Sequence, residues 1–190
     1  MNNCIIIPGR PGKNEYYSSN IPSPSNHHWF PWIQKQLCMK GILTQVLEMP
    51  TPFAPVYEEW KMVLDMFPLD KTYSLVGHSC GAGFLLRYLS EHKISAHQLI
   101  LVAPWLDPIK HVTGDFFKFE RDPAMLSRVR SLHILNSSDD LKSGIQESVS
   151  MIKAWYPSAI MHEFVDRGHF TIEAMRTQEF PELLDIIVGS

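Results

Sequence analysis

The sequence predicts an α/β fold of three layers (α/β/α, doubly wound), in which helices cover both faces of a mostly parallel sheet of about six strands. Short apolar, β-branched runs alternate along the chain with longer stretches of helical periodicity. Several of the short runs are apolar at every position, as expected for strands that are buried on both faces. A length of 190 residues, 45% of them hydrophobic, allows one well-packed core, so we expect a single domain over residues 1–190.

Six runs are strand candidates. The first, residues 4–7, ends at Pro8-Gly9, and the second, residues 43–49, ends at Pro50, because proline and glycine interrupt strands. The other four candidates are residues 73–76, 99–102, 132–135 and 160–165. Because helical stretches lie between them, successive strands are expected to run parallel to one another.

Helical periodicity predicts five helices, four of them between predicted strands and one after the last strand. In residues 29–39 the apolar side chains of Trp29, Trp32, Ile33 and Leu37 fall near one face. The other helical stretches are residues 57–67, 81–92, 144–155 and 172–187.

Two segments show neither the pattern of a strand nor that of a helix. Residues 10–28 are rich in proline, serine and asparagine, and residues 105–121 combine Pro108 and Gly114 with several phenylalanines. Loops of this length in compact domains often carry function. The sequence leaves open whether they form a lid or ordinary surface loops.

Charge and cysteine content exclude several classes of protein. The formal net charge is −3 and no basic block runs along the chain, which argues against a nucleic-acid partner. The three cysteines have no C-x-x-C spacing, which disfavours a disulfide framework or a zinc site and is typical of the cytoplasm. Neither a signal peptide nor a membrane-spanning segment is expected.

One motif carries chemistry. Residues 77–81 read Gly-His-Ser-Cys-Gly and match G-x-S-x-G, directly after one predicted strand and directly before a predicted helix. This strand-turn-helix context is typical of a nucleophile elbow, in which a strained turn presents the serine, here Ser79, above the sheet. Gly77 and Gly81 are expected where a side chain would collide with neighbouring backbone.

A serine nucleophile needs a base and an acid. His169 follows the last predicted strand, at the sheet edge where parallel sheets place their sites. The acid is expected after the strand at 132–135, where Asp139 and Asp140 are both candidates. Asp166, three residues before His169, is a weaker third candidate.

The backbone N–H groups of Cys80 and Arg10 are the candidate oxyanion donors, because one follows the nucleophile and the other lies in the loop after the first strand. The Cys80 thiol is better interpreted as a buried structural group than as a nucleophile. His27 and His28 suggest a metal ligand pair, but no third ligand accompanies them in sequence, so an ordinary loop pair is the favoured interpretation.

These motifs together resemble the small α/β-hydrolases typified by retinoblastoma-binding protein 9 and the bacterial YdeN-like proteins. The resemblance rests on residues 5–9, 28–32, 77–81, 137–140 and 168–170. It implies a minimal serine hydrolase without a large cap domain, with Ser79, Asp140 and His169 as its triad. The sequence departs from the family pattern after Asp140 and in the longer loop after Gly9, which bears on substrate specificity.

We therefore expect hydrolysis of a small ester, thioester or amide, with a small-molecule acyl substrate and with neither a cofactor nor a metal. Candidate substrate contacts are Gly9, His78, Trp29 and Trp105, although the turn favours a supporting role for His78 and the aromatic residues can equally belong to the core. Two alternatives stay open. One is a binding or scaffold protein on the same fold, with a protein partner. The other is acyl transfer, lyase or cofactor-free peroxidase chemistry at the same site.

Overall fold

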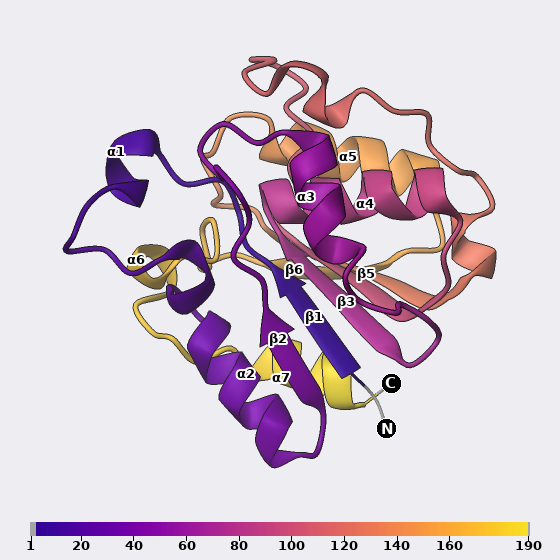
Figure 1. Ribbon diagram of the computed structural model, residues 1–190, viewed down its shortest axis with the longest axis horizontal. Coiled ribbons are helices and arrows are strands. Elements are labelled where there is room, and N and C mark those ends of the chain that lie inside the picture. The colour runs from indigo at the N-terminus through magenta and orange to yellow at the C-terminus, as the bar shows by residue number, and fades with distance from the viewer. Residues whose placement is uncertain (1–2, 190) are drawn as a thin grey trace.

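The structure, a computed structural model, describes residues 3–189 and is built on one six-stranded parallel sheet (Figure 1). The strand order is β2-β1-β3-β4-β5-β6, and every neighbouring pair is parallel. The strands are β1 (Asn3–Ile7), β2 (Leu43–Val46), β3 (Tyr73–His78), β4 (Ala96–Val102), β5 (Val129–Ser137) and β6 (Ile160–Phe164). Each of the six predicted strands is present.

Helices cover both faces of this sheet, which confirms the predicted three-layer α/β architecture. Figure 1 shows α2 and α7 on one side and α3, α4 and α5 on the other. The α-helices are α1 (Lys13–Tyr16), α2 (Phe30–Met39), α3 (Tyr57–Leu64), α4 (Cys80–His92), α5 (Ile145–Trp155), α6 (Ile172–Met175) and α7 (Pro181–Val188). Short 3₁₀ turns form at Pro24–Asn26, Gly114–Phe117 and Met125–Ser127.

The helix predicted over residues 172–187 is wrong, because the chain forms two helices there. Arg176 ends α6 in the left-handed conformation at φ 58°, and α7 begins at Pro181, which fits the first turn of a helix but not its interior. The segment 10–28 also contains α1 and a 3₁₀ turn, where the sequence predicted no regular structure. The strand predicted over 43–49 ends at Val46.

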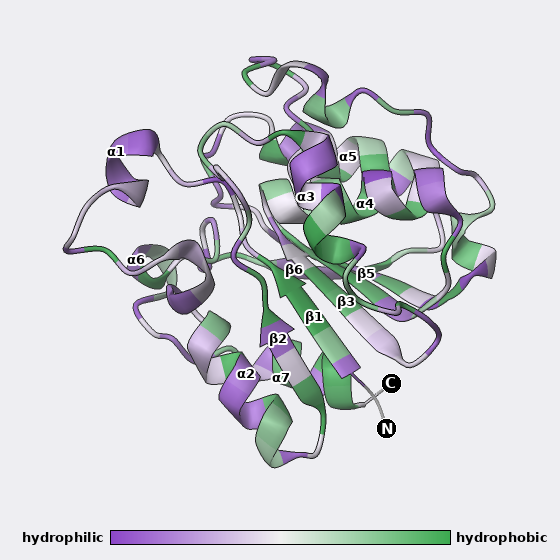
Figure 2. Ribbon diagram, viewed as in Figure 1, coloured by the Kyte–Doolittle hydropathy of each residue, from purple (hydrophilic) through white to green (hydrophobic). Residues whose placement is uncertain are grey.

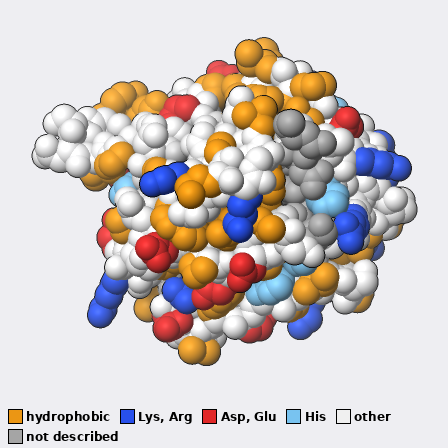
Figure 3. Space-filling model, turned by 90° about the horizontal axis from the view of Figure 1, so that it is seen from below, with side chains coloured by type: hydrophobic (Ala, Val, Ile, Leu, Met, Phe, Trp, Pro, Cys, Tyr) orange, Lys and Arg blue, Asp and Glu red, His pale blue; other side chains and the backbone are white. Residues whose placement is uncertain are grey.

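The apolar core lies between the sheet and both helical layers. The central strands carry its hydrophobic side chains, as the green colour of β1 and β3 shows in Figure 2. On the face seen in Figure 3, acidic and basic side chains are interspersed rather than gathered by sign. Among the helices in residues 3–189, none combines the length and the apolar character that crossing a membrane requires.

The parallel register brings the strand ends that matter to one edge. Ile7 of β1 pairs with Gly77 of β3, and His78 pairs with Val102 of β4. The loops that follow these three strands therefore begin side by side at the carboxyl edge, where open parallel sheets bind ligands.

Candidate active site

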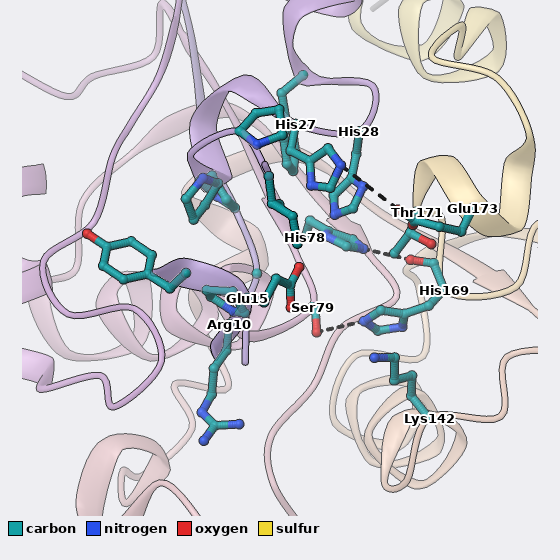
Figure 4. A pocket seen from close by; sticks show the side chains of 18 residues that line it. Arg10, Glu15, His27, His28, His78, Ser79, Lys142, His169, Thr171 and Glu173 are labelled. Carbon is teal, nitrogen blue, oxygen red and sulfur yellow. Dashed lines mark hydrogen bonds and ion pairs between the residues drawn. The ribbon is translucent and has the colours of Figure 1, made fainter. Parts of the chain in front are cut away.

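Ser79 occupies the sharp turn between β3 and α4. Its backbone lies at φ 53° and ψ −117°, a region that strongly favours glycine, so the conformation is strained. Two of its backbone hydrogen bonds tie it to the end of β4 and the loop that follows: the Ser79 N–H donates to Val102 O at 2.9 Å, and the Trp105 N–H donates to Ser79 O at 3.1 Å. The strained turn directs the hydroxyl away from the sheet and toward the loop that carries His169 (Figure 4).

The two glycines of the motif are needed for close approach of backbone segments. A Cβ at Gly77 would lie 2.4 Å from the Ala82 Cα, and a Cβ at Gly81 would lie 2.3 Å from Ile7 O. Neither added Cβ could be accommodated without a shift of the neighbouring backbone. The start of α4 consequently lies directly against the end of β1, so the loop that begins at Pro8 is brought beside Ser79.

Ser79, His169 and Asp140 form one hydrogen-bonded line. The Asp140 Oδ2 lies 2.7 Å from His169 Nδ1, and His169 Nε2 lies 3.0 Å from Ser79 Oγ. Figure 4 shows the contact between His169 and Ser79. Because a carboxylate can only accept, Nδ1 carries the proton, which leaves Nε2 free to accept from the serine hydroxyl. The Asp140 carboxylate is buried, and its Oδ1 accepts from the backbone N–H of Lys142 at 2.9 Å.

The two other acidic candidates lie elsewhere. Asp139 Oδ1 accepts from the Gly168 N–H at 2.9 Å and from the Ser137 hydroxyl at 2.5 Å. These bonds lower the pKa of Asp139, the serine hydroxyl first among them. Asp139 therefore holds the loop that carries His169 without touching the imidazole, whereas Asp166 is paired loosely with Arg167 at 3.7 Å.

His78 supports the loop that carries His169. Its Nε2 lies 2.8 Å from the carbonyl oxygen of His169, and because a carbonyl oxygen can only accept, Nε2–H is the donor. Burial lowers the pKa of His78 well below its usual value, with a further contribution from His169. The ring borders a cavity beside Ser79, but its hydrogen bond fixes the position of His169, which favours a supporting role.

Both expected oxyanion donors are available. Neither the Cys80 N–H nor the Arg10 N–H donates to any group among residues 3–189, and the former begins α4, where free N–H groups favour an anion. The Cys80 side chain is fully buried, and burial raises the pKa of its thiol. A buried, protonated thiol is a poor nucleophile, so the side chain is structural.

Two cavities meet at Ser79, and both include Arg10, Lys142 and His169 in their walls. The first, of about 210 Å³, we name the histidine pocket. Its further polar lining residues are Glu15, Tyr16, His27, His28, His78, Thr171 and Glu173. The second, of about 320 Å³, we name the tryptophan pocket. Its further lining residues are Trp105, Lys110, Val112, Ser143 and Ile145. Both long irregular segments of the sequence therefore contribute walls to the site.

Glu173 lies beside His27 and His28, so a third potential metal ligand is present that the sequence did not reveal. However, the two imidazole rings stack with centroids 4.0 Å apart and an interplanar angle of 21°. Ligand lone pairs lie in the ring plane, so nearly parallel rings direct them side by side rather than to a common point. His28 Nδ1 also accepts from the Ile172 N–H at 3.2 Å. The arrangement favours a polar wall over a metal centre.

The expectation that Trp29 contacts substrate is wrong. Its indole is fully buried, packs against Phe30 and Phe180, and donates its N–H to the Phe170 carbonyl at 3.1 Å. Trp29 therefore belongs to the core, and its hydrogen-bond partner Phe170 is the residue that follows His169. By contrast, Trp105 lines the tryptophan pocket and Gly9 lines the histidine pocket, where a Cβ on Gly9 would lie 3.1 Å from that of Ser79.

Sequence reasoning missed Lys142, Lys110 and Glu173 as lining residues. The position of Lys142, two residues after a candidate acid, was the one available signal. Because Glu173 and Lys110 carry no motif, only the folded chain brings them to the site.

The chain is similar to known proteins in both sequence and fold. Residues 21–187 match the family model described as serine hydrolase. YdeN of Bacillus subtilis (strain 168), a protein named as a hydrolase, is 28% identical over 93% of this chain and 95% of its own. The crystal structure of YdeN superposes with a TM-score of 0.79 at 24% identity, covering 100% of this chain and 98% of that one.

Two more distant structures share the fold. Est1E from Butyrivibrio proteoclasticus, solved with ferulic acid bound, has a TM-score of 0.67 at 16% identity, over 99% of this chain and 88% of that one. An α/β serine hydrolase without a lid, from Xanthomonas campestris, has a TM-score of 0.63 at 16% identity, over 98% of this chain and 81% of that one.

Proposed function

Because this chain belongs to the serine hydrolase family, we propose that it cleaves a small ester, thioester or amide through an acyl-enzyme formed on Ser79. The observation that carries the proposal is the line from the Asp140 carboxylate through His169 to the Ser79 hydroxyl, with hydrogen bonds of 2.7 and 3.0 Å. A hydroxyl is a weak nucleophile until a base removes its proton, and here an imidazole in the required tautomer lies within reach.

In the first half-reaction Ser79 Oγ attacks the substrate carbonyl carbon while His169 Nε2 accepts the hydroxyl proton. The Asp140 carboxylate keeps the imidazole oriented and stabilises the imidazolium that forms. Negative charge develops on the carbonyl oxygen, toward which the Cys80 and Arg10 N–H groups are available as donors. Removing one such donor typically costs about 10²–10³ in kcat.

The tetrahedral intermediate then collapses. His169 returns its proton to the leaving oxygen, sulfur or nitrogen, the bond to that atom breaks, and the acyl group remains on Ser79. In the second half-reaction water takes the place of the leaving group. His169 accepts one of its protons, hydroxide attacks the acyl carbon, and the same imidazole returns the proton to Ser79 as the acid product departs.

Labelling with a fluorophosphonate probe tests this proposal. The wild-type protein is expected to react at Ser79 at neutral pH, as located by mass spectrometry of the labelled peptide. Ser79→Ala is expected to abolish labelling, and His169→Gln to slow it strongly, while both variants keep the wild-type circular dichroism spectrum. A panel of p-nitrophenyl esters and aminoacyl amides of graded size then separates esterase from amidase activity. Absence of labelling in the folded wild-type protein would overturn the proposal.

A further inference from the structure

The tryptophan pocket differs in charge from the rest of the protein. The chain as a whole carries a formal charge of −3, yet this pocket is lined by three cations, Arg10, Lys110 and Lys142, and by no aspartate or glutamate. None of the three cations forms an ion pair with a carboxylate in the part of the chain that the structure describes. Their charges are therefore available to a bound molecule.

The carboxylates closest along the chain are already bound to other groups. Asp107 is buried, and its Oδ2 accepts from the N–H and the hydroxyl of Thr113, at 2.8 and 2.9 Å. Asp140 is held between His169 and the backbone N–H of Lys142. The second of these bonds fixes the Lys142 backbone beside the imidazole. Figure 4 accordingly shows the Lys142 side chain alongside His169, with Arg10 on the other side of Ser79.

The remaining walls suit a short carbon chain. The apolar residues among the pocket's lining are Trp105, Val112 and Ile145. The indole N–H of Trp105 donates to Ser143 O at 3.0 Å, so it offers no donor to a ligand. Charge attraction from the lysines and Arg10 is thus the main polar recognition that this pocket provides.

We propose that the tryptophan pocket binds the anionic end of the substrate, so that the preferred substrate is an ester or thioester with a carboxylate or phosphate a few carbon atoms from the scissile carbonyl. This inference rests on the proposed hydrolase function and specifies its substrate class. Long-range attraction of this kind also raises the encounter rate with an anion and weakens with salt.

Matched esters test the inference. p-Nitrophenyl hemiglutarate carries a carboxylate where p-nitrophenyl valerate carries a methyl group, on an acyl chain of the same length. 4-Acetoxybenzoate and its methyl ester place the same difference on the leaving group. For at least one pair we expect kcat/KM to favour the anion by about tenfold at low ionic strength, and the preference to shrink in 0.5 M NaCl.

The double variant Lys110→Gln/Lys142→Gln is expected to remove most of this preference, measured as the ratio of kcat/KM for the anionic ester to kcat/KM for its neutral partner. Lys118→Gln/Lys153→Gln is the matched control, because it removes the same charge from two exposed lysines that do not line either pocket. It is expected to keep the preference.

The outcomes separate the two proposals. Turnover of the neutral esters without any preference for the anions, or a preference that survives in Lys110→Gln/Lys142→Gln, overturns the anion subsite and leaves the hydrolase function standing. If none of the esters is turned over, the subsite is judged by calorimetric titration of glutarate into Ser79→Ala. Binding that is lost with the two lysines supports the subsite, and absence of binding overturns it.

Discussion

Asp139 and Asp140 are neighbours in the chain, and their carboxylates bind neighbouring residues of one distant loop. Asp140 binds the His169 imidazole at 2.7 Å, and Asp139 binds the Gly168 N–H at 2.9 Å. The pair therefore divides two tasks between adjacent residues. One carboxylate orients the ring, and the other holds the backbone from which the ring extends.

Exchange of each carboxylate for an amide separates these tasks. Asp140→Asn is expected to lower kcat by about 10³–10⁴, because an amide at this position can favour the wrong imidazole tautomer. Asp139→Asn is expected to lower kcat by about tenfold with little change in KM, since it weakens the hold on Gly168 without touching the imidazole. Steady-state kinetics and urea unfolding of both variants check this. Equal losses of kcat, or a loss that follows a drop in the urea midpoint, would contradict the division.

Gly81→Ala is expected to destabilise the fold strongly. Its Cβ would lie 2.3 Å from Ile7 O and 2.5 Å from Pro8 O, so β1 and α4 must separate. Overpacking against backbone typically costs about 1–3 kcal/mol and here is expected at the upper end or beyond. Urea denaturation measures the change. Gly12→Ala is the control, because its nearest neighbour is the Glu15 side chain at 3.7 Å, and a loss as large in that variant would argue against the steric explanation.

Trp29→Phe tests the assignment of this indole to the core. The substitution removes the N–H that donates to Phe170 O and leaves a buried carbonyl without that partner, so stability is expected to fall by about 2–4 kcal/mol. The order of kcat/KM over p-nitrophenyl esters of two to eight carbon atoms should not change. Trp105→Phe, in the wall of the tryptophan pocket, is expected to change that order. A changed order in Trp29→Phe would return this residue to the substrate site.

The paired histidines on β5 and β6 predict a loss of stability in mild acid. His133 Nδ1 lies 3.0 Å from His162 Nε2, and burial, with His162 beside it, lowers the pKa of His133 to about 4. In the unfolded chain this pKa is about 6.5, so between pH 6.5 and 4 the unfolded state binds a proton that the folded state does not. The free energy of unfolding therefore has its full value above pH 6.5 and decreases as the pH falls. At pH 5 the decrease due to His133 is about 2 kcal/mol.

Urea unfolding at pH 7 and pH 5 measures this effect. His133→Gln is expected to lose less stability between the two pH values than the wild-type protein does. His111→Gln, in an exposed loop, serves as the control and should follow the wild type. An identical pH dependence for His133→Gln and wild type would show that the histidine pair does not titrate in this way.

Local sequence determined the strands, the elbow and two members of the hydrogen-bonded line, Ser79 and His169. Apolar runs that end at proline or glycine predict strands, because each signal acts over a few residues. The motif at residues 77–81 predicts a serine in a strained turn for the same reason. Pro181 is also a local signal for the break between α6 and α7, but the apolar pattern continues on both sides of it and predicted one helix.

Tertiary structure alone decided what surrounds the serine. Residues alone left Asp139, Asp140 and Asp166 open, and family resemblance favoured Asp140; in the fold, it is Asp140 that reaches the imidazole, while Asp139 reaches the backbone. The sequence offered both Trp29 and Trp105 as candidate substrate contacts, yet Trp29 is fully buried and Trp105 lines a pocket. Burial and long-range contact depend on how distant segments pack, and no local pattern of residue types records that.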